Sequence, residues 1–169
     1  MKRILTACLL AFLFVTYSFN RSWAEETSIL DTQFNTVSGE TLKLSDYKGQ
    51  VVVLNFWATW CPPCIDEIPE LIQFQKDYHE RGLQVIGVDY MERPDQERLS
   101  KFIKKHGINY PVIFGQPGEI QKLARAMGGV FGLPVTKFLD SNGSLITSHV
   151  GGITLHQLKS NVKPHLLGR

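Results

Sequence analysis

The sequence predicts an α/β fold in which a mixed central sheet is flanked by helices, and three observations lead to this prediction. Residues 51–56 form a continuous, mostly branched apolar run, which is typical of a central strand covered on both faces. Helix-like and strand-like segments then alternate along the chain, and two strand-like segments near its end form an antiparallel pair. With 169 residues, of which 43% are hydrophobic and 20% charged, the chain suits a single globular domain.

The other elements before the final pair follow from periodicity and turn signals. Ahead of the central strand, residues 34–46 alternate around Ser38-Gly39, as a hairpin does. After it, the pattern predicts in order a helix from residue 65 to residue 82, a strand over 83–88, a helix over 94–106, a strand over 110–114 and a helix over 119–127. Pro94 is expected to open the second of these helices and Gly107 to close it.

The chain ends in a predicted hairpin and a helix. Strands over residues 135–139 and 144–150 flank a turn over 140–143 that contains Asn-Gly. The stretch from Thr154 to Gln157 resembles a capping box and is expected to start the last helix.

The first 24 residues differ from the rest and predict a targeting segment. Lys2 and Arg3 precede an apolar run over residues 4–19, and Ser22-Trp23-Ala24 has the small-residue pattern of a cleavage site. The predicted divisions are a signal peptide, a polar lead-in and a folded domain, over residues 1–24, 25–33 and 34–169.

An uncleaved membrane anchor is the competing interpretation of the same segment. Its apolar run of 16 residues is shorter than the roughly 20 needed to span a bilayer, but Trp23 at the outer edge suits a membrane interface. Cys8 lies in a string that resembles a lipoprotein signal, although few apolar residues precede it. Under both interpretations the domain is expected outside the cytoplasm, either periplasmic or tethered to the membrane.

The net charge of +2 belongs to the targeting segment. Without residues 1–24, the chain carries 15 basic against 16 acidic side chains. No basic stripe or block is present, so the sequence gives no reason to expect nucleic-acid binding. The same division leaves Cys61 and Cys64 as the two cysteines of the folded domain.

The spacing of Cys61 and Cys64 favours chemistry over structural support. A disulfide that closes so short a loop adds little stability through chain entropy. A structural zinc site commonly uses two close ligand pairs, and the five scattered histidines form no second pair, so we predict no metal. Because the pair follows a buried strand and opens a helix, the dipole favours a thiolate on Cys61. We therefore predict an exposed nucleophile at Cys61, with Cys64 resolving mixed disulfides.

The two residues between the cysteines suggest a direction for the reaction. Neither Pro62 nor Pro63 has a backbone N–H, so only Cys64 and later residues can donate one to the Cys61 sulfur. We hypothesise that the Cys61 pKa is less depressed than in strongly oxidising proteins, which favours a reductant. Alternatively, Pro62 simply suits the first helical turn.

These residues carry a resemblance to a known family. The run VLNFWATWCPPCIDEIPEL over residues 53–71, with GVFGLP over 129–134 and the hairpin region over 140–152, resembles the TlpA/ResA-like branch of the thioredoxin-fold proteins. The similarity covers about residues 30–158. It implies a thioredoxin-like three-layer sandwich with a four- or five-stranded sheet, an N-terminal hairpin, and a strand-helix unit inserted after the first helix.

The resemblance also implies a function and partners. It implies an extracytoplasmic thiol–disulfide oxidoreductase that uses the redox-active disulfide Cys61–Cys64 and no cofactor. In relatives the usual task is the reduction of protein disulfides, notably in apocytochrome c before haem attachment. The implied partners are therefore protein thiols and disulfides, apocytochrome c among them, and a membrane thiol-electron donor.

The predicted substrate-binding residues are Trp60, Pro62, Leu133 and Pro134. Leu133-Pro134 matches the loop proline that in this fold is cis and lies against the cysteines, leaving the preceding backbone free to pair with a substrate strand. Val135 follows where many relatives carry threonine, so the groove is expected to differ. Trp60 can offer unfolded substrates a flat apolar contact, or it can serve packing alone.

Glu67 is the third predicted catalytic residue. It lies on the same helical side as Cys64, and in the family this acid helps to move protons for the cysteine pair. The alternative is a solvated glutamate that favours the helix dipole. Asn55 stands where ordinary thioredoxins carry a buried acid, and an amide cannot take that proton. Its alternative role is that of a hydrogen-bonded polar residue in the core.

Two other functions remain as alternatives. A thiol peroxidase would need a hydroxyl residue shortly before its cysteine and an arginine nearby, but Thr59 is too close and Ala58 stands three residues before Cys61. A non-enzymatic copper carrier could use Cys61, Cys64 and His149 as soft ligands. His149 is expected instead to be a surface residue of the terminal hairpin.

Overall fold

A computed structural model describes residues 28–166, so the predicted signal peptide, Cys8 and the start of the lead-in lie outside the described residues. The strands are β1 (Phe34–Thr36), β2 (Thr41–Leu42), β3 (Val51–Trp57), β4 (Leu83–Asp89), β5 (Val112–Phe114), β6 (Val135–Leu139) and β7 (Leu145–Val150). The α-helices are α2 (Pro62–Tyr78), α3 (Gln96–His106), α4 (Pro117–Ala126) and α5 (Leu155–Val162). Short 3-10 turns are η1 (Ile29–Asp31), η2 (Leu44–Tyr47), η3 (His79–Arg81) and η4 (Lys163–His165).

The strands join in one mixed sheet, which confirms the predicted fold class. The strand order in the described part of the chain is β2-β1-β5-β4-β3-β6-β7. Strands β3, β4 and β5 are parallel, whereas β6 runs antiparallel to β3, and β7 to β6. The predicted count of four or five strands is wrong, because the N-terminal hairpin adds β1 and β2 to the same sheet through β5.

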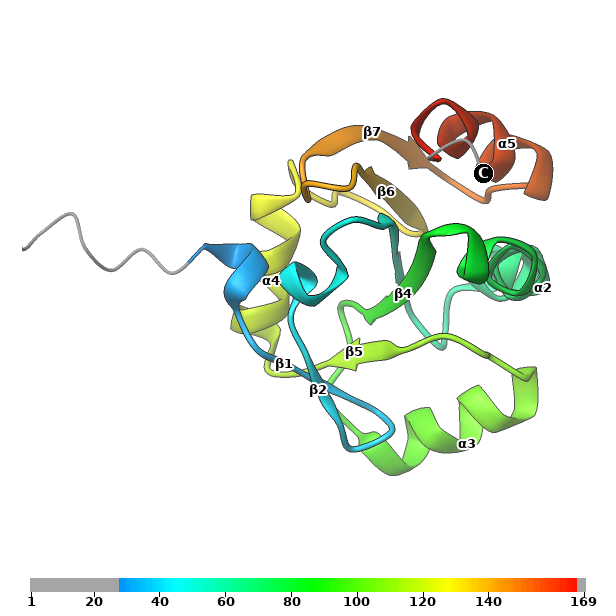
Figure 1. Cartoon of the computed structure of the whole chain (residues 1–169). Helices are drawn as coiled ribbons and strands as arrows, with labels where there is room; N and C mark the ends of the chain where they lie inside the picture. Colours follow the sequence, from blue (N-terminus) through cyan, green and yellow to red (C-terminus); the bar gives the residue numbers. More distant parts are fainter. Residues whose placement is uncertain (1–27, 167–169) are drawn as a thin grey trace, which may run out of the picture.

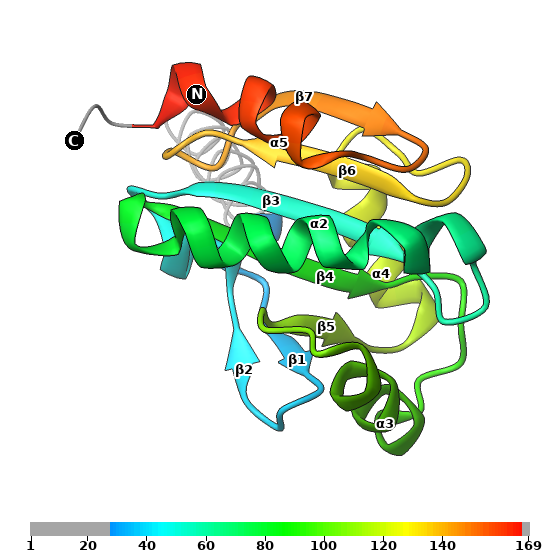
Figure 2. The same ribbon diagram turned by 90° about the vertical axis from the view of Figure 1, so that its right-hand side faces the viewer.

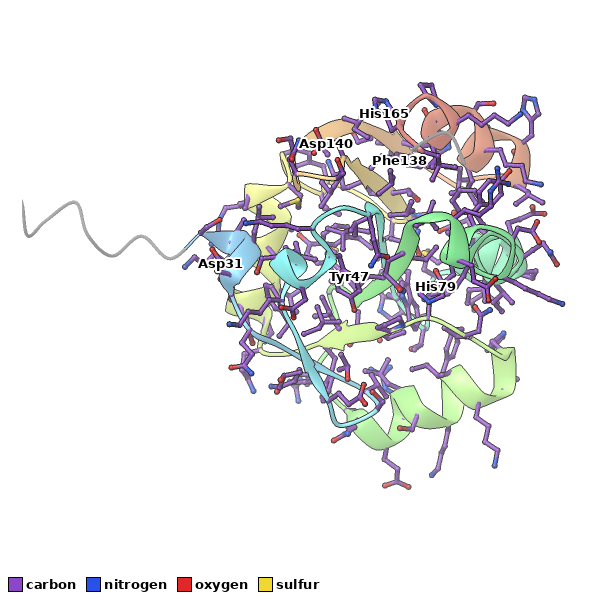
Figure 3. The ribbon with its side chains drawn as sticks, in the orientation of Figure 1. Asp31, Tyr47, His79, Phe138, Asp140 and His165 are labelled. Carbon is purple, nitrogen blue, oxygen red and sulfur yellow. A yellow bond between two sulfur atoms is a disulfide. The ribbon has the colours of Figure 1, made fainter. Side chains whose placement is uncertain are left out.

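The sheet lies between two helical layers, and a separate apolar core fills each side (Figures 1 and 2). Helices α2, α3 and α5 pack on one face, around side chains that include Phe74, Leu99 and Leu158. Helix α4 and the turns η1 and η2 cover the other face. Side chains fill the space between the layers (Figure 3). The central strand β3 is buried along its whole length, as its apolar run predicts.

Helix α3 corrects one predicted boundary. The helix begins at Gln96 and not at Pro94, because the Asp95 side chain caps it by accepting a hydrogen bond from the Arg98 N–H at 2.9 Å. Gly107 ends it with a φ of 68°, in the left-handed region where glycine carries no Cβ penalty. Strand β4 and helix α3 follow α2 in the chain, and β4 pairs with the central strand β3 along its whole length.

Helix α2 runs over Pro62–Tyr78 and not over 65–82, because its helical turns begin directly after Cys61 and the 3-10 turn η3 takes up residues 79–81. Most of the other boundaries lie within two residues of the pattern. Helix α4 starts at Pro117, two residues earlier than predicted, and the β5 strand starts at Val112. The capping box at the start of α5 is confirmed. The Thr154 side chain accepts the Gln157 N–H, and the Gln157 side chain accepts the Thr154 N–H. Among residues 28–166, no helix has the length and apolar character needed to span a membrane.

Candidate active site

The two cysteines of the domain form a disulfide where β3 passes into α2. The sulfur atoms are 2.05 Å apart, and the Cα atoms are separated by 5.3 Å. Cys61 is the N-cap residue of α2, and Pro62 and Pro63 occupy the first helical positions. The predicted placement of the pair at a helix N-terminus is therefore correct.

Cys61 is not the exposed residue that the sequence predicts. It keeps 4% of its surface accessible, whereas Cys64 keeps none. The reason is that the sulfur atoms pack against the apolar core beneath α2, which includes Trp57, Ala58 and Ile68. Of the two cysteines, Cys61 is therefore the more accessible residue, and Cys64 is fully enclosed.

The first turn of α2 has few backbone donors. The N–H groups of Cys64 and Ile65 both donate to the carbonyl oxygen of Cys61, each at 3.1 Å. The N–H of Cys61 itself donates to the Ala58 carbonyl at 3.2 Å. Together with the missing N–H groups of the two prolines, this leaves the turn with no free N–H group directed at the Cys61 sulfur in the oxidised protein.

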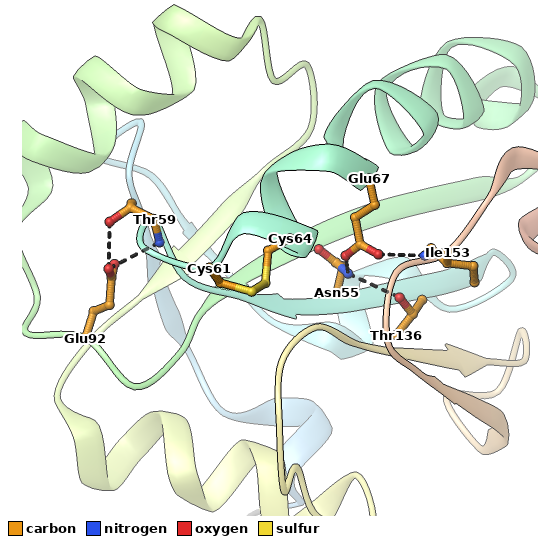
Figure 4. Close-up of a disulfide and its surroundings, with 8 residues drawn as sticks. All are labelled: Asn55, Thr59, Cys61, Cys64, Glu67, Glu92, Thr136 and Ile153. Atoms are coloured by element: carbon orange, nitrogen blue, oxygen red, sulfur yellow. Dashed lines mark hydrogen bonds between the residues drawn. A yellow bond between two sulfur atoms is a disulfide. The ribbon is translucent and has the colours of Figure 1, made fainter.

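Glu67 lies buried one turn after Cys64, with 3% of its surface exposed. One carboxylate oxygen accepts a hydrogen bond from Asn55 Nδ2 at 2.7 Å, and the other accepts from the Ile153 N–H at 2.9 Å (Figure 4). Asn55 also donates to Thr136 Oγ1 at 3.1 Å. Burial raises the pKa of Glu67 to about 7, although the bonds from Asn55 and Ile153 act in the opposite direction.

This hydrogen-bond network excludes one of the two interpretations of Glu67. For Asn55 it shows a core residue that also contacts the acid. The solvated glutamate is wrong, because α5 and the loop before it cover this part of α2 and enclose the carboxyl group. Asn55 is a hydrogen-bonded core residue, and it contacts the acid directly. A carboxyl group with a pKa about 7 can hold or release a proton near neutral pH, next to a disulfide.

The predicted loop proline also lies at this site. The Leu133–Pro134 peptide bond is cis, as the resemblance implies. Pro134 is buried, and its carbonyl accepts the Gly151 N–H at 2.9 Å. Leu133 is half-buried between the two cores. Within residues 28–166 its own backbone groups make no hydrogen bond, which agrees with the expectation that they are free to pair with a substrate.

Exposed apolar side chains gather at the same edge of the sheet. Trp60 and Met91 follow the ends of the parallel strands β3 and β4, and both are exposed. Phe131, in the loop before β6, is 98% exposed, and Val150 ends β7 opposite Val135. Trp57, by contrast, is buried and stacks on Phe102, so the two tryptophans divide into one packing residue and one surface residue.

A second polar network lies on the other side of the disulfide from Glu67 (Figure 4). The Thr59 hydroxyl donates to Glu92 Oε1 at 2.6 Å, and Arg98 forms an ion pair with Glu92 at 3.0 Å. Glu92, Arg98 and Thr136 are not among the site residues predicted from the sequence. A polar residue within a buried apolar strand was the available signal for Thr136, since buried polar groups need partners. No local signal marks the other two.

The geometry of the site gives little support to the two alternative functions, a thiol peroxidase and a copper carrier. Arg98 does contact Thr59, but both are bonded to Glu92, and the Thr59 hydroxyl donates away from the disulfide. His149 is half-buried at the surface, where its ring nitrogen lies 3.1 Å from the Gly152 oxygen. Within the described part of the chain, no three His, Cys, Asp or Glu side chains group in a way that could hold a metal ion.

Comparison with known proteins agrees with this site. The model of the AhpC/TSA family matches residues 26–148. The thiol-disulfide oxidoreductase ResA of Bacillus thuringiensis subsp. konkukian (strain 97-27) is 34% identical over 127 residues, which are 75% of this chain and 70% of that protein. A thiol:disulfide interchange protein of Chlorobium tepidum TLS has a similar structure, with a TM-score of 0.70 and 32% identity over 80% of this chain and 93% of that one.

A third similar protein is an exposed lipoprotein. The pneumococcal exposed lipoprotein thioredoxin of Streptococcus pneumoniae strain TIGR4 superposes with a TM-score of 0.69 and 28% identity, covering 79% of this chain and 98% of that one.

A thioredoxin-like sheet, with a disulfide between its central strand and the following helix and a cis-proline loop at the same edge, defines a thiol–disulfide oxidoreductase. The chain belongs to the AhpC/TSA family, and its TlpA/ResA-like character is confirmed by the ResA relatives. Its substrates are protein thiols and disulfides.

Proposed function

We propose that this oxidoreductase works outside the cytoplasm as a reductant of protein disulfides, with Cys61 as the attacking sulfur. The reducing direction is inferred from the first turn of α2, which has few free backbone N–H donors. The N–H groups of Cys64 and Ile65 are bonded to the Cys61 carbonyl, and the two prolines have none. A Cys61 thiolate therefore receives little hydrogen-bond stabilisation, and a dithiol that is poorly stabilised in its reduced form gives up its electrons readily.

The exchange proceeds in two sulfur-transfer steps. The Cys61 thiolate attacks one sulfur of a substrate disulfide, so that a mixed disulfide forms and the other substrate sulfur leaves as a thiolate. The Cys64 thiol then passes its proton to the Glu67 carboxylate and attacks the Cys61 sulfur. The second substrate thiolate leaves, and the Cys61–Cys64 disulfide remains. The dithiol has lost two electrons and the substrate disulfide has gained them.

Glu67 suits the proton transfer because of its place and its pKa. It lies one turn after Cys64 on the same helix, and burial raises its pKa to about 7, partly offset by the hydrogen bonds from Asn55 and Ile153. Near neutral pH both forms of the carboxyl group are populated. The group can therefore take the Cys64 proton and release it after the cycle.

Unfolded or extended polypeptides are the substrates that the surface favours. Trp60, Met91, Phe131 and Val150 present apolar surface around the disulfide, and the free Leu133 backbone can add a substrate strand. Segments of apocytochrome c carry the Cys-x-x-Cys-His pattern and fit this description. We include apocytochrome c among the proposed substrates, with a membrane thiol protein as the electron donor.

The location outside the cytoplasm rests on two supports. The predicted signal peptide or anchor over residues 1–24 supports it, and one relative with a similar structure is an exposed lipoprotein.

The direction is tested by the reduction potential of the Cys61–Cys64 pair. In equilibrium with glutathione buffers, we expect a potential closer to the about −270 mV of thioredoxin than to the about −120 mV of DsbA. Titration of the Cys61 thiolate by its ultraviolet absorbance should give a pKa closer to about 7 than to about 3.5. A strongly oxidising potential together with a pKa near the lower value would contradict the proposal.

The substrates are identified by trapping. Cys64→Ala leaves Cys61 able to form a mixed disulfide that cannot be resolved, so partners stay attached in the native compartment. The double variant Cys61→Ala, Cys64→Ala is the control, because it cannot form such a bond. An oxidised Cys-x-x-Cys-His peptide, compared with oxidised insulin, tests the cytochrome substrate directly. Rapid consumption of hydrogen peroxide by the wild type would instead favour the peroxidase.

A further inference from the structure

The loop that leads to Cys61 is tied to two charged residues from distant segments. Thr59 donates both its backbone N–H, at 3.2 Å, and its hydroxyl, at 2.6 Å, to Glu92 Oε1 (Figure 4). Arg98 Nη1 donates to the same carboxylate oxygen at 3.0 Å and to Thr59 Oγ1 at 2.8 Å, and Nη2 donates to Glu92 Oε2 at 3.0 Å. Each of the three side chains is therefore bonded to both others. We call these three residues the Thr59 clamp.

The clamp is built around a buried carboxylate. The Glu92 side chain is 3% exposed, whereas that of Arg98 is 40% exposed, so the arginine covers the acid from the solvent side. Two parallel N–H donors from one guanidinium form a strong, directional pair with a carboxylate. A buried pair of this kind is costly to break on one side, because the remaining charge loses its partner.

Asp89 helps to keep Glu92 ionised. Burial raises the pKa of Asp89 to about 8, and the hydrogen bond and the charge of Glu92 act in the same direction. Asp89 therefore holds a proton near neutral pH and shares it with Glu92. Burial acts to raise the pKa of Glu92, but hydrogen bonds from Asp89, Arg98 and Thr59 outweigh it and lower the pKa. Glu92 remains an acceptor for Thr59.

The clamp joins three elements at the active site. Thr59 lies between β3 and α2, two residues before Cys61, while Glu92 follows β4 and Arg98 lies on α3. The loop has one further turn bond, from the Cys61 N–H to the Ala58 carbonyl. The segment from the end of β4 to α3 thus supplies both charged residues that hold the loop before the reactive sulfur.

We propose that Glu92 and Arg98 are positioning residues for disulfide exchange, which hold Thr59 and thereby fix the Cys61 sulfur in the direction of attack. They take up no proton or electron in the reaction. The inference rests on the proposed role of Cys61 as the attacking sulfur. Sulfur exchange needs the three sulfur atoms to be aligned, and a misplacement of about 1 Å can cost on the order of 100-fold in rate.

The test compares the reduced full-length domain and its variants in exchange with 5,5′-dithiobis(2-nitrobenzoic acid) and with oxidised insulin. Thr59→Val and Arg98→Met should each lower the exchange rate by about tenfold, a fraction of the loss that a displacement of about 1 Å can cause. The loss should fall on kcat with insulin and leave KM nearly constant. Thr59→Ser, which keeps the hydroxyl, should restore most of the rate.

Lys101→Met is the matched control for the arginine variant. It removes a cation from the same helix and breaks an exposed ion pair with Glu97, far weaker than the buried one. Thermal unfolding of each variant fixes a temperature at which all are folded, and the rates are compared there. If Thr59→Val does not fold, the exchange rate of Arg98→Met, compared with that of Lys101→Met, is the test of the proposal.

Three results would overturn the proposal. These are wild-type rates in both Thr59→Val and Arg98→Met, a loss in Thr59→Val that Thr59→Ser fails to restore, and an equal loss in Lys101→Met. The test is separate from the proposed direction of the reaction. If the potential shows the wild type to be an oxidant, the variants are compared in the oxidising direction, and the clamp makes the same prediction.

Discussion

Glu67 makes structural contacts on which its proposed role in proton transfer also depends. Its carboxyl group accepts hydrogen bonds from Asn55 and from the backbone of Ile153, so it links the central strand to the segment before α5. The same burial raises its pKa to about 7, because the charged form is poorly solvated.

The variant Glu67→Gln separates these roles. The introduced amide can keep both contacts if the Asn55 amide turns over. The Asn55 oxygen then accepts from the introduced NH₂ group and from the Thr136 hydroxyl, while the introduced carbonyl oxygen accepts the Ile153 N–H. We therefore expect a folded protein whose resolution of mixed disulfides is slower and has lost the pH dependence near 7. Stopped-flow kinetics between about pH 5 and pH 9 measure this, and an unchanged profile would exclude the proton transfer.

The same residue makes the oxidised protein less stable as pH rises. The folded pKa of about 7 exceeds the ordinary 4.5, so the native state binds the extra proton between these values. This contribution is present in full below about pH 4.5 and is lost as pH rises through 7, with a size on the order of 3 kcal/mol. Urea unfolding at several pH values measures this. Between about pH 4.5 and pH 7, the free energy of unfolding should decrease less in Glu67→Gln than in the wild type.

Among the elements, β4 is fitted closely to its neighbours beside the site. A Cβ added to Gly87 would lie 2.8 Å from Trp57 Nε1 and 3.2 Å from Val112 Cγ2. Neither neighbour can move easily, because Trp57 stacks on Phe102 at 5.1 Å and Val112 is buried. Glycine is needed here for the close approach of side chains, not for an unusual backbone angle.

Gly87→Ala should therefore destabilise the protein by about 1–3 kcal/mol, the usual range for an overfilled core. Gly118→Ala is the control, because it lies in α4 with nothing within 4 Å of the added Cβ. Alanine there should be neutral or stabilise the helix by up to about 1 kcal/mol. Chemical denaturation of both variants measures the difference, and equal stability in the two would refute the packing argument.

Across the molecule as a whole, the topology assembles the site from segments that are far apart in the chain. The ends of β3 and β4 and the starts of β6 and α2 meet at one edge, because β3 and β4 are parallel and β6 runs back beside β3. The disulfide, the cis-proline loop and the exposed apolar side chains share that edge. Protein substrates should therefore contact several segments at once.

Phe131→Ser tests this edge. The ring is 98% exposed, so its loss should leave stability unchanged, but it should raise KM for oxidised insulin by about fivefold if half-burial in the complex contributes about 1 kcal/mol. The rate with a small aromatic disulfide should fall far less. Leu145→Ser is the matched control, because Leu145 is an exposed apolar residue at the other end of β7. The same KM change in both variants would show that the edge has no special role.

Local sequence patterns were sufficient to predict the fold class, the order of the elements, and the place of Cys61 and Cys64 between a buried strand and a helix. Apolar periodicity, capping residues and turn residues act over a few positions, so they can be recognised without the fold. The family resemblance also indicated the cis Leu133–Pro134 bond. The depth at which Cys61 and Glu67 are buried, and the membership of Thr136, Glu92 and Arg98 in the site, became visible only in the folded structure. Burial and hydrogen bonding join residues up to 86 positions apart, and their partners depend on how the helices pack on the sheet.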